Sequence, residues 1–215
     1  IGASNLTFRS ISSNGAGSGI VLNNTGAGRL IVTGDASTNT CKTGTTTCSG
    51  GTIQNSTADG VSLTRAKATL ALMWIKNNAN SGIKGMTVAG FSASDLLIQN
   101  NTNAPGEQAG ILINDLTDSA AQVTRAEVSG SKEDNVRIHN TSTTGTITFS
   151  NCTIIDNDSN PLGAGNQGLF LQTNSTGNLT GSSPQVLKFQ NDFLPAKETT
   201  RIDYRANLAS YPLTA

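Results

Sequence analysis

The stretch from residue 134 to residue 157, DNVRIHNTSTTGTITFSNCTIIDN, decides the fold. It holds two short runs in which apolar and polar residues alternate, and a polar turn follows each run. Val136 and Ile138 point to one side of the first run. Arg137 and His139 point to the other side, because successive side chains of a strand alternate between its two faces. The pattern therefore predicts short strands with one buried side.

The second run of this stretch contains a change of phase. Ile147 and Phe149 repeat the alternation of the first run. At Asn151 the phase slips by one residue, and Cys152 and Ile154 then take the inward side. This unit recurs, with variations, along almost the whole sequence, so each copy is expected to supply two or three short strands.

Two signatures mark the copies. The first is a glycine followed by two apolar residues separated by one position, as at 19–22, 60–63, 110–113 and 168–171, with 135–138 as a variant that starts with asparagine. The second ends in Ile or Val and often leads into asparagines, as at 70–75, 93–98, 123–128 and 149–154. The distance from Gly60 to Gly82 is 22 residues and that from Asn135 to Gly168 is 33. Repeats of this length with variable loops are typical of a solenoid of stacked coils.

Stacking explains how such short units can be stable. Copies stacked about 4.8 Å apart would pair every strand with its equivalents above and below. Like residues would then form columns, and the expected inward column is Val61, Ile83, Ile111, Val136 and Leu169. Asparagines at equivalent turns would form hydrogen-bonded ladders. The glycine before each strand would supply the positive φ that a sharp corner needs.

The Gly-Ile-x-Leu strand and the Asn-Cys-Thr-Ile run at 151–154 resemble the right-handed parallel β-helix superfamily, the fold of pectate lyases. In character they are most like the β-helix repeats of large bacterial secreted and surface proteins. The resemblance covers about residues 5 to 194. It implies an all-β, single-stranded right-handed parallel β-helix of about six to seven coils. Residues 1–215 are expected to form one such domain within a longer protein. The resemblance selects no activity, because one scaffold serves many functions.

The repeat is interrupted between Leu22 and Ile53. The sequence predicts an additional strand at residues 30–32 and a loop that projects from the rod at residues 35–50. At the other end, residues 195–215 predict either a tail packed along the rod or a closing strand.

The loop at 35–50 contains two of the three cysteines. Cys41 and Cys48 flank a short Gly/Thr-rich segment, in which two cysteines readily reach disulfide geometry. We expect a Cys41–Cys48 disulfide rather than two free thiols, and such a bond implies an oxidising compartment. Cys152 lies in an apolar phase and is expected to be a buried core residue.

The composition argues against several classes of protein. Charged residues make up 13% of the chain, with 14 basic and 14 acidic residues scattered singly, so no basic stripe is available for nucleic acid. The most apolar stretch, residues 70–75, is far too short to span a membrane, and no signal peptide is visible at the start. The 23 glycines, with many Thr, Asn and Ser, disfavour helices and favour short strands joined by turns.

Outward acidic residues are the candidates for catalysis or metal binding on the rod. Stacking of the coils could bring together Asp59, Asp95, Asp115, Asp118, Asp134 and Asp156. A pair of carboxylates would support glycoside hydrolysis, and several together would bind calcium. The alternative, which we favour, is that each is a turn residue that hydrogen-bonds nearby backbone. We therefore assign no catalytic residue and no metal ligand, and leave calcium open as a cofactor.

Trp74, Arg137 and His139 are the candidate ligand-binding residues. In the frame set by residues 149–154, Met73 and Ile75 face inward and Trp74 faces outward, where an indole can stack on a sugar ring. A slip of one residue would bury Trp74 instead. His139 is the only histidine, and the sequence shows no acid or base paired with it.

The expected function is that of a non-enzymatic structural or adhesive segment of a secreted or cell-surface protein. It would display loops and an outward face to a polysaccharide or a cell-surface protein, with no nucleic-acid partner. One alternative is a polysaccharide lyase or glycoside hydrolase that acts on an acidic polysaccharide. A further alternative is a segment of a trimeric phage tail fibre.

Overall fold

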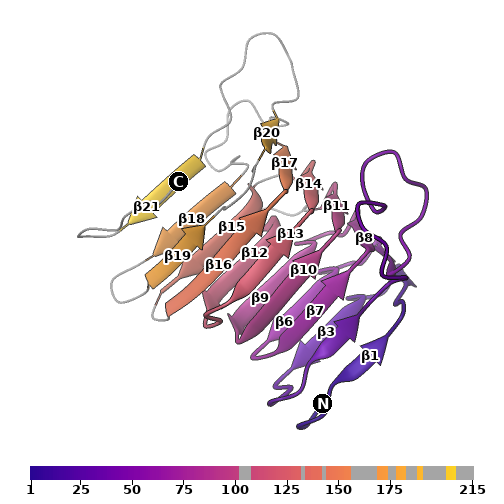
Figure 1. The fold of residues 1–215 in the computed structure, drawn as a ribbon, viewed down its shortest axis with the longest axis horizontal. Helices are drawn as coiled ribbons and strands as arrows, with labels where there is room; N and C mark the ends of the chain where they lie inside the picture. The colour runs from indigo at the N-terminus through magenta and orange to yellow at the C-terminus, as the bar shows by residue number, and fades with distance from the viewer. Residues whose placement is uncertain are drawn as a thin grey trace.

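The computed structural model is an all-β solenoid in which three parallel sheets run side by side (Figure 1). It describes residues 1–101, 108–131, 134–141, 144–155, 169–173, 178–182, 188–190 and 202–206. Each coil contributes one short strand to each sheet, and the coils are stacked in the order of the sequence. All strand pairs between coils are parallel, as a coiled chain requires.

The first strands of the coils form sheet A, which contains β1 (Leu6–Phe8), β4 (Leu30–Val32), β7 (Lys67–Ala71), β10 (Gly90–Ser94), β13 (Ala121–Thr124), β16 (Thr144–Ser150) and β19 (Asn178–Ser182). Sheet B contains β2 (Ser13–Asn14), β5 (Gly51–Gln54), β8 (Met73–Lys76), β11 (Leu97–Gln99), β14 (Glu127–Ser129), β17 (Thr153–Ile155) and β20 (Lys188–Gln190). Sheet C contains β3 (Ile20–Asn23), β6 (Val61–Thr64), β9 (Ile83–Val88), β12 (Ala109–Leu116), β15 (Asp134–Asn140), β18 (Leu169–Thr173) and β21 (Ile202–Ala206).

The parallel β-solenoid predicted from the sequence is confirmed. Strands β1 to β15 make five complete turns, where six to seven coils were expected, and β16 to β21 extend each sheet to seven strands. The additional strand predicted at residues 30–32 is β4. The right-handed sense of the coil stays a prediction. Within the described ranges no helix has the length and apolarity to cross a membrane.

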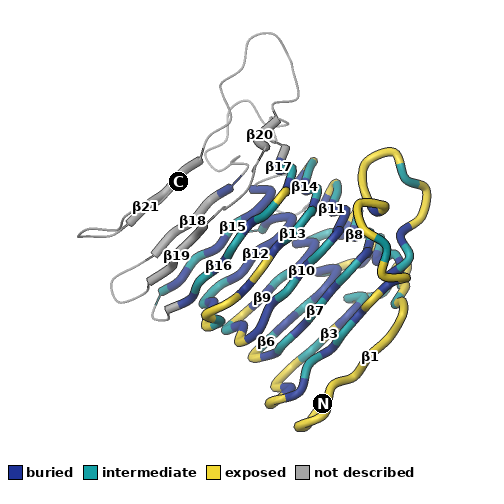
Figure 2. Tube along the Cα trace, viewed as in Figure 1, coloured by how far each residue is buried: buried dark blue, intermediate teal, exposed yellow. Residues whose placement is uncertain are grey.

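The predicted inward column lies in sheet C. Val61 pairs with Ile83, Ile83 with Ile111, Ile111 with Val136, and Val136 with Leu169. Each of these side chains is at most 4% exposed. Together with the inward residues of sheets A and B they form one continuous core along the axis. The buried residues recur as dark blue segments along successive coils (Figure 2).

Sheet A shows how the inward side chains of neighbouring coils are matched in size. Ala68 pairs with Phe91 in one inward column, and Leu70 pairs with Ala93 in the next. A large side chain therefore stacks on a small one in both columns, with the order reversed between them. This exchange keeps the summed side-chain volumes of the two strands similar, which favours dense packing at the usual strand spacing.

Asparagines in left-handed backbone turn the chain from sheet B toward sheet C. Asn55, Asn77 and Asn100 have φ values of 55°, 54° and 52°, a conformation that asparagine tolerates better than most residues. The predicted asparagine ladder follows directly: Asn78 Nδ2 donates a hydrogen bond to Asn101 Oδ1 at 2.8 Å. Both of these amides are buried, so the ladder satisfies polar groups inside the corner.

The glycines that open the first signature have a different role from the one predicted. Gly60, Gly82 and Gly110 do not have positive φ, so the prediction that they supply a turn conformation is wrong. The structure shows instead that a Cβ has no room. A Cβ on Gly82 would lie 2.6 Å from the carbonyl oxygen of Gly110 and 2.9 Å from Asn101 Nδ2. Close approach of successive coils therefore requires glycine at this corner.

We expect Gly82→Ala to lower the free energy of unfolding by about 1–3 kcal/mol, because the added methyl group must push the next coil away. The control is Gly17→Ala, where a Cβ would meet no atom within 4 Å and φ is not positive. That variant should be neutral or more stable by up to about 1 kcal/mol, because alanine restricts the unfolded chain. Urea denaturation measures both values, and equal effects would contradict the close-approach explanation.

Candidate functional site

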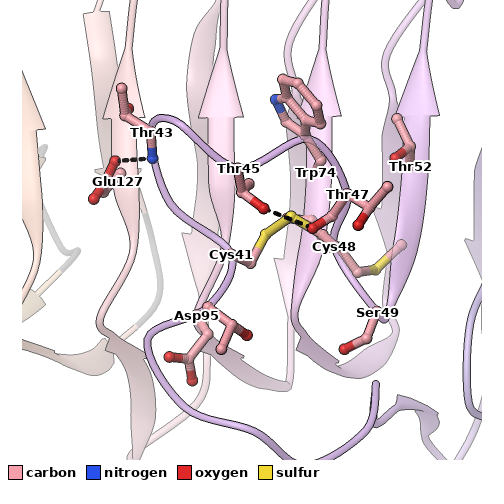
Figure 3. Close-up of a disulfide and its surroundings, with 12 residues drawn as sticks. Cys41, Thr43, Thr45, Thr47, Cys48, Ser49, Thr52, Trp74, Asp95 and Glu127 are labelled. Carbon is pink, nitrogen blue, oxygen red and sulfur yellow. Dashed lines mark hydrogen bonds between the residues drawn. A yellow bond between two sulfur atoms is a disulfide. The ribbon is translucent and has the colours of Figure 1, made fainter.

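The insertion between β4 and β5 is a loop closed by the predicted Cys41–Cys48 disulfide, which is confirmed with a Cα–Cα distance of 5.1 Å. Residues 35–50 leave the coil and fold across the outer face of sheet B (Figure 3). We call residues 35–50 the clasp and its tip, residues 42–47, the crown. Apart from the half-buried Thr45, every residue of the crown is exposed.

The clasp covers apolar side chains that point outward from sheet B. Trp74 and Leu97 are paired in the same outward column of β8 and β11. Leu97 is nevertheless only 1% exposed, because it packs with Cys41, Cys48 and Leu72 in a small apolar cluster outside the main core. The underside of the clasp is therefore seated on a hydrophobic patch.

Two carboxylates on later coils hold the clasp in place. The backbone N–H of Asn39 donates to Asp95 Oδ1 at 2.6 Å, and that of Thr43 donates to Glu127 Oε2 at 2.6 Å. Arg125 also donates two hydrogen bonds to the carboxylate of Asp95, at 2.9 and 2.7 Å, and this pairing raises the pKa of the guanidinium. The clasp is thus tied to two later coils, the one that contains β10 and β11 and the one that contains β13 and β14.

Asp35 closes the base of the clasp. Its Oδ1 accepts hydrogen bonds from the hydroxyl and the backbone N–H of Ser37 and from the hydroxyl of Ser49. The bonds with Ser37 and Ser49 lower the pKa of Asp35 to about 2. Because the folded pKa lies below the ordinary value of 3.8, the ionised carboxylate favours the closed base above that value. This contribution is lost as the pH falls through about 2.

Trp74 faces outward, as the sequence frame predicted, and is half buried against the clasp. Its Nε1 donates a hydrogen bond to Gln99 Oε1 at 3.0 Å. The ammonium of Lys76 lies 3.3 Å from the ring centroid, so that a cation already covers one face of the indole. A role for Trp74 in ligand binding stays a prediction.

Arg137 and His139 lie two residues apart on the outward side of β15, in sheet C. Arg137 forms an ion pair with Asp134 at 3.3 Å, and its side chain is 14% exposed. His139 Nε2 is buried and has no hydrogen-bond partner among the described residues. The structure therefore brings Arg137 and His139 together and leaves Trp74 on sheet B, a different face of the rod.

The described aspartates of the predicted outward set accept hydrogen bonds from backbone N–H groups or pair with an arginine, and most of these contacts join different coils. They are Asp59, Asp95, Asp115, Asp118 and Asp134. Asp118, for example, accepts hydrogen bonds from the backbone N–H groups of Phe91 and Ala120. Asp156 lies outside the described residues. Within the described part of the chain, no three acidic, His or Cys side chains are grouped closely enough to hold a metal ion. Only the bond from Ala120 to Asp118 is the local turn contact that the sequence suggested, whereas the backbone bonds to Asp59, Asp95 and Asp115 join different coils.

Cys152 is buried, which confirms the prediction of a core residue. Its thiol donates a hydrogen bond to the carbonyl oxygen of Val123 at 3.3 Å. Burial raises the pKa of the Cys152 thiol, so the reactive thiolate is disfavoured.

The sequence did not predict the residues on which the clasp packs, namely Leu72, Leu97 and Glu127. A usable signal was present at residues 96–98, where three apolar residues follow one another. In a strand with one buried side, the middle member of such a run must point outward. An outward leucine indicates that another segment covers that part of the sheet.

We expect Asp95→Ala to release the clasp, because it removes the acceptor for Asn39 and the ion pair with Arg125. The free energy of unfolding should fall by about 1.5–3 kcal/mol, and trypsin should cleave after Lys42 faster. Asp95→Asn keeps one acceptor oxygen and should have a smaller effect. Asp118→Ala, which also removes backbone hydrogen bonds but far from the clasp, should leave cleavage after Lys42 unchanged. An unchanged rate in Asp95→Ala would show that this carboxylate does not hold the clasp.

We expect Asp59→Asn to stabilise the protein at neutral pH. Burial raises the pKa of Asp59 above 3.8 in spite of the nearby Lys84, so the ionised form weakens folding above the raised pKa. Asparagine keeps an oxygen that can accept the hydrogen bond from Ser81 N–H. The gain in Tm over the parent chain should therefore be present at pH 7 and should shrink as the pH falls toward 3.8. A gain that is equal at both pH values would contradict this explanation.

Comparison of the chain with models of known protein families, with curated proteins and with solved structures finds no match.

Proposed function

We propose that this chain is a non-enzymatic structural or adhesive segment of a secreted or cell-surface protein. In this proposal it presents its loops and outer faces to a glycan or to a surface protein. The observation that carries the proposal is the clasp. Its underside is fixed by a disulfide, an apolar seat and the carboxylates of Asp95 and Glu127, while its crown is left exposed.

Such a loop is suited to recognition. A rigid scaffold that positions an exposed loop is a common way to build a binding surface. Because the clasp is already ordered before contact, little conformational entropy remains to be lost on binding. The crown carries threonine hydroxyls and one ammonium group, from Lys42, which are suited to hydrogen bonding with a hydroxyl-rich or carbonyl-rich partner.

The proposed location rests on the disulfide, because such bonds persist mainly in oxidising compartments. The resemblance of the repeat to β-helix segments of bacterial secreted and surface proteins supports the same location by analogy of fold. Cleavage of an acidic polysaccharide would instead need at least two free carboxylates about 5–10 Å apart in a groove. The described aspartates of the outward set accept hydrogen bonds from backbone N–H groups or pair with arginines, so we favour display over catalysis.

The test is binding of the purified chain to an array of neutral and acidic glycans. We expect the crown variant Lys42→Ala/Thr46→Ala/Thr47→Ala to lose at least tenfold in affinity for the bound glycans with an unchanged Tm. The control variant Ser119→Ala/Gln122→Ala changes two exposed residues, one just before β13 and one in β13 of sheet A, and should bind like the parent chain. Equal binding by the crown and control variants would contradict a contact surface on the clasp. Release of cleaved products from polygalacturonate would contradict a non-enzymatic role.

A further inference from the structure

Stacking of the coils brings two basic side chains together on the outer face of sheet A. Leu30 pairs with Ala68 and both are buried in the core, so the residues before them, Arg29 and Lys67, lie side by side on the outward side. Lys67 pairs in turn with Gly90 of β10. Both basic residues are half-buried. Charges that are scattered singly along the sequence thus become neighbours through the register of the coils.

The guanidinium of Arg29 reaches across the neighbouring strands. Its Nη1 donates a hydrogen bond to the hydroxyl of Thr69 in β7 at 2.8 Å. Its Nη2 lies 2.9 Å from the position that a Cβ would take on Gly90, and Cγ of Lys67 lies 3.0 Å from the same position. The space that a side chain at residue 90 would fill is therefore occupied by the two basic side chains, which converge above this glycine.

These two cations have no acidic partner in the described part of the chain. The ion pairs described there join Arg125 to Asp95 and Arg137 to Asp134. Asp118, on the next coil, accepts hydrogen bonds from two backbone N–H groups instead. Like charges that lie opposite each other on neighbouring strands destabilise a sheet. An anion bound between the two cations would remove this repulsion.

We propose that Arg29, Lys67, Thr69 and Ser92 form a binding site for the sulfate group of a sulfated glycan. Ser92 pairs with Thr69, so the two hydroxyl side chains are neighbours on the outward side. Among the described residues, neither the ammonium of Lys67 nor the hydroxyl of Ser92 has a hydrogen-bond partner. Thr69 accepts the bond from Arg29 through its oxygen and keeps its own hydroxyl hydrogen to donate.

The donor set favours a tetrahedral anion. A carboxylate is planar and is held best by the fork of a single guanidinium. Here a guanidinium, an ammonium and two hydroxyl groups come from separate side chains, which suits a group with several oxygens pointing in different directions. Hydrogen bonds from cations to an anion are about twice as strong as neutral ones. The choice of a glycan as the carrier rests on the proposed function, whereas the sulfate site itself does not.

The first test measures the Tm of the chain in sodium sulfate and in sodium chloride of equal ionic strength. Sulfate stabilises folded proteins in general, but a bound ion adds a further gain. We expect the gain of the parent chain to exceed that of Arg29→Gln/Lys67→Gln. Lys84→Gln, which removes a charge from sheet C, should gain as much as the parent. An equal gain in the parent and the double variant overturns the site.

The second test measures binding of dextran sulfate, uncharged dextran and polygalacturonate by calorimetry. The parent chain should bind dextran sulfate most tightly, and Arg29→Gln/Lys67→Gln should weaken that binding roughly tenfold. Gly90→Val keeps every charge but fills the space above residue 90, and should weaken it to a similar extent. Circular dichroism verifies that each variant keeps its fold.

Equal binding of dextran sulfate by Gly90→Val and the parent would indicate attraction to positive charge in general, and overturns the site. Polygalacturonate that binds as tightly as dextran sulfate contradicts the choice of sulfate. A chain that gains Tm from inorganic sulfate but does not bind dextran sulfate overturns the glycan as carrier. The crown variant Lys42→Ala/Thr46→Ala/Thr47→Ala should gain Tm from sulfate like the parent, so failure of the crown contact and failure of this site are distinguishable.

Discussion

In-register hydrogen bonding between successive coils is the constraint on which the rest of this structure depends. Once Val61, Ile83 and Ile111 occupy one column, every other residue of their strands has a fixed side. The corners must then be equally compact in each coil. This requirement explains the left-handed asparagines, the buried amide ladder and the glycines that have no room for a Cβ. Local sequence choices that look unrelated are consequences of one stacking geometry.

The three outer faces differ because of what lies on them. In sheet B the outward column changes from Thr52 through Trp74 and Leu97 to Glu127. Its apolar middle lies under the clasp, and its acidic end accepts a hydrogen bond from Thr43 in the crown. Sheet C carries Arg137 and His139 side by side, and no loop of comparable construction is described there. Sheet B is therefore the face on which the clasp adds an ordered, exposed loop to the regular surface of the solenoid.

The columns could be predicted from the sequence because a period of two residues is a strong signal wherever one side of a strand is buried. Cys41 and Cys48 could be paired because they are close in sequence. The role of Gly82 could not be assigned correctly, since a glycine signals either positive φ or a close approach and the pattern is the same for both. The contact between Asn39 and Asp95 spans 56 residues, and no local pattern encodes it. Long-range contacts of loops therefore needed the structure, whereas the coil did not.

The clasp has a consequence for how the solenoid loses its structure. In most repeat proteins each unit touches only its neighbours, so that units can fray one by one from an end. The hydrogen bond from Thr43 to Glu127 joins residues 84 positions apart, across several coils. We therefore expect the coils under the clasp to lose their structure together with it rather than one by one. A short disulfide-closed loop thus couples coils that would otherwise contact only their immediate neighbours.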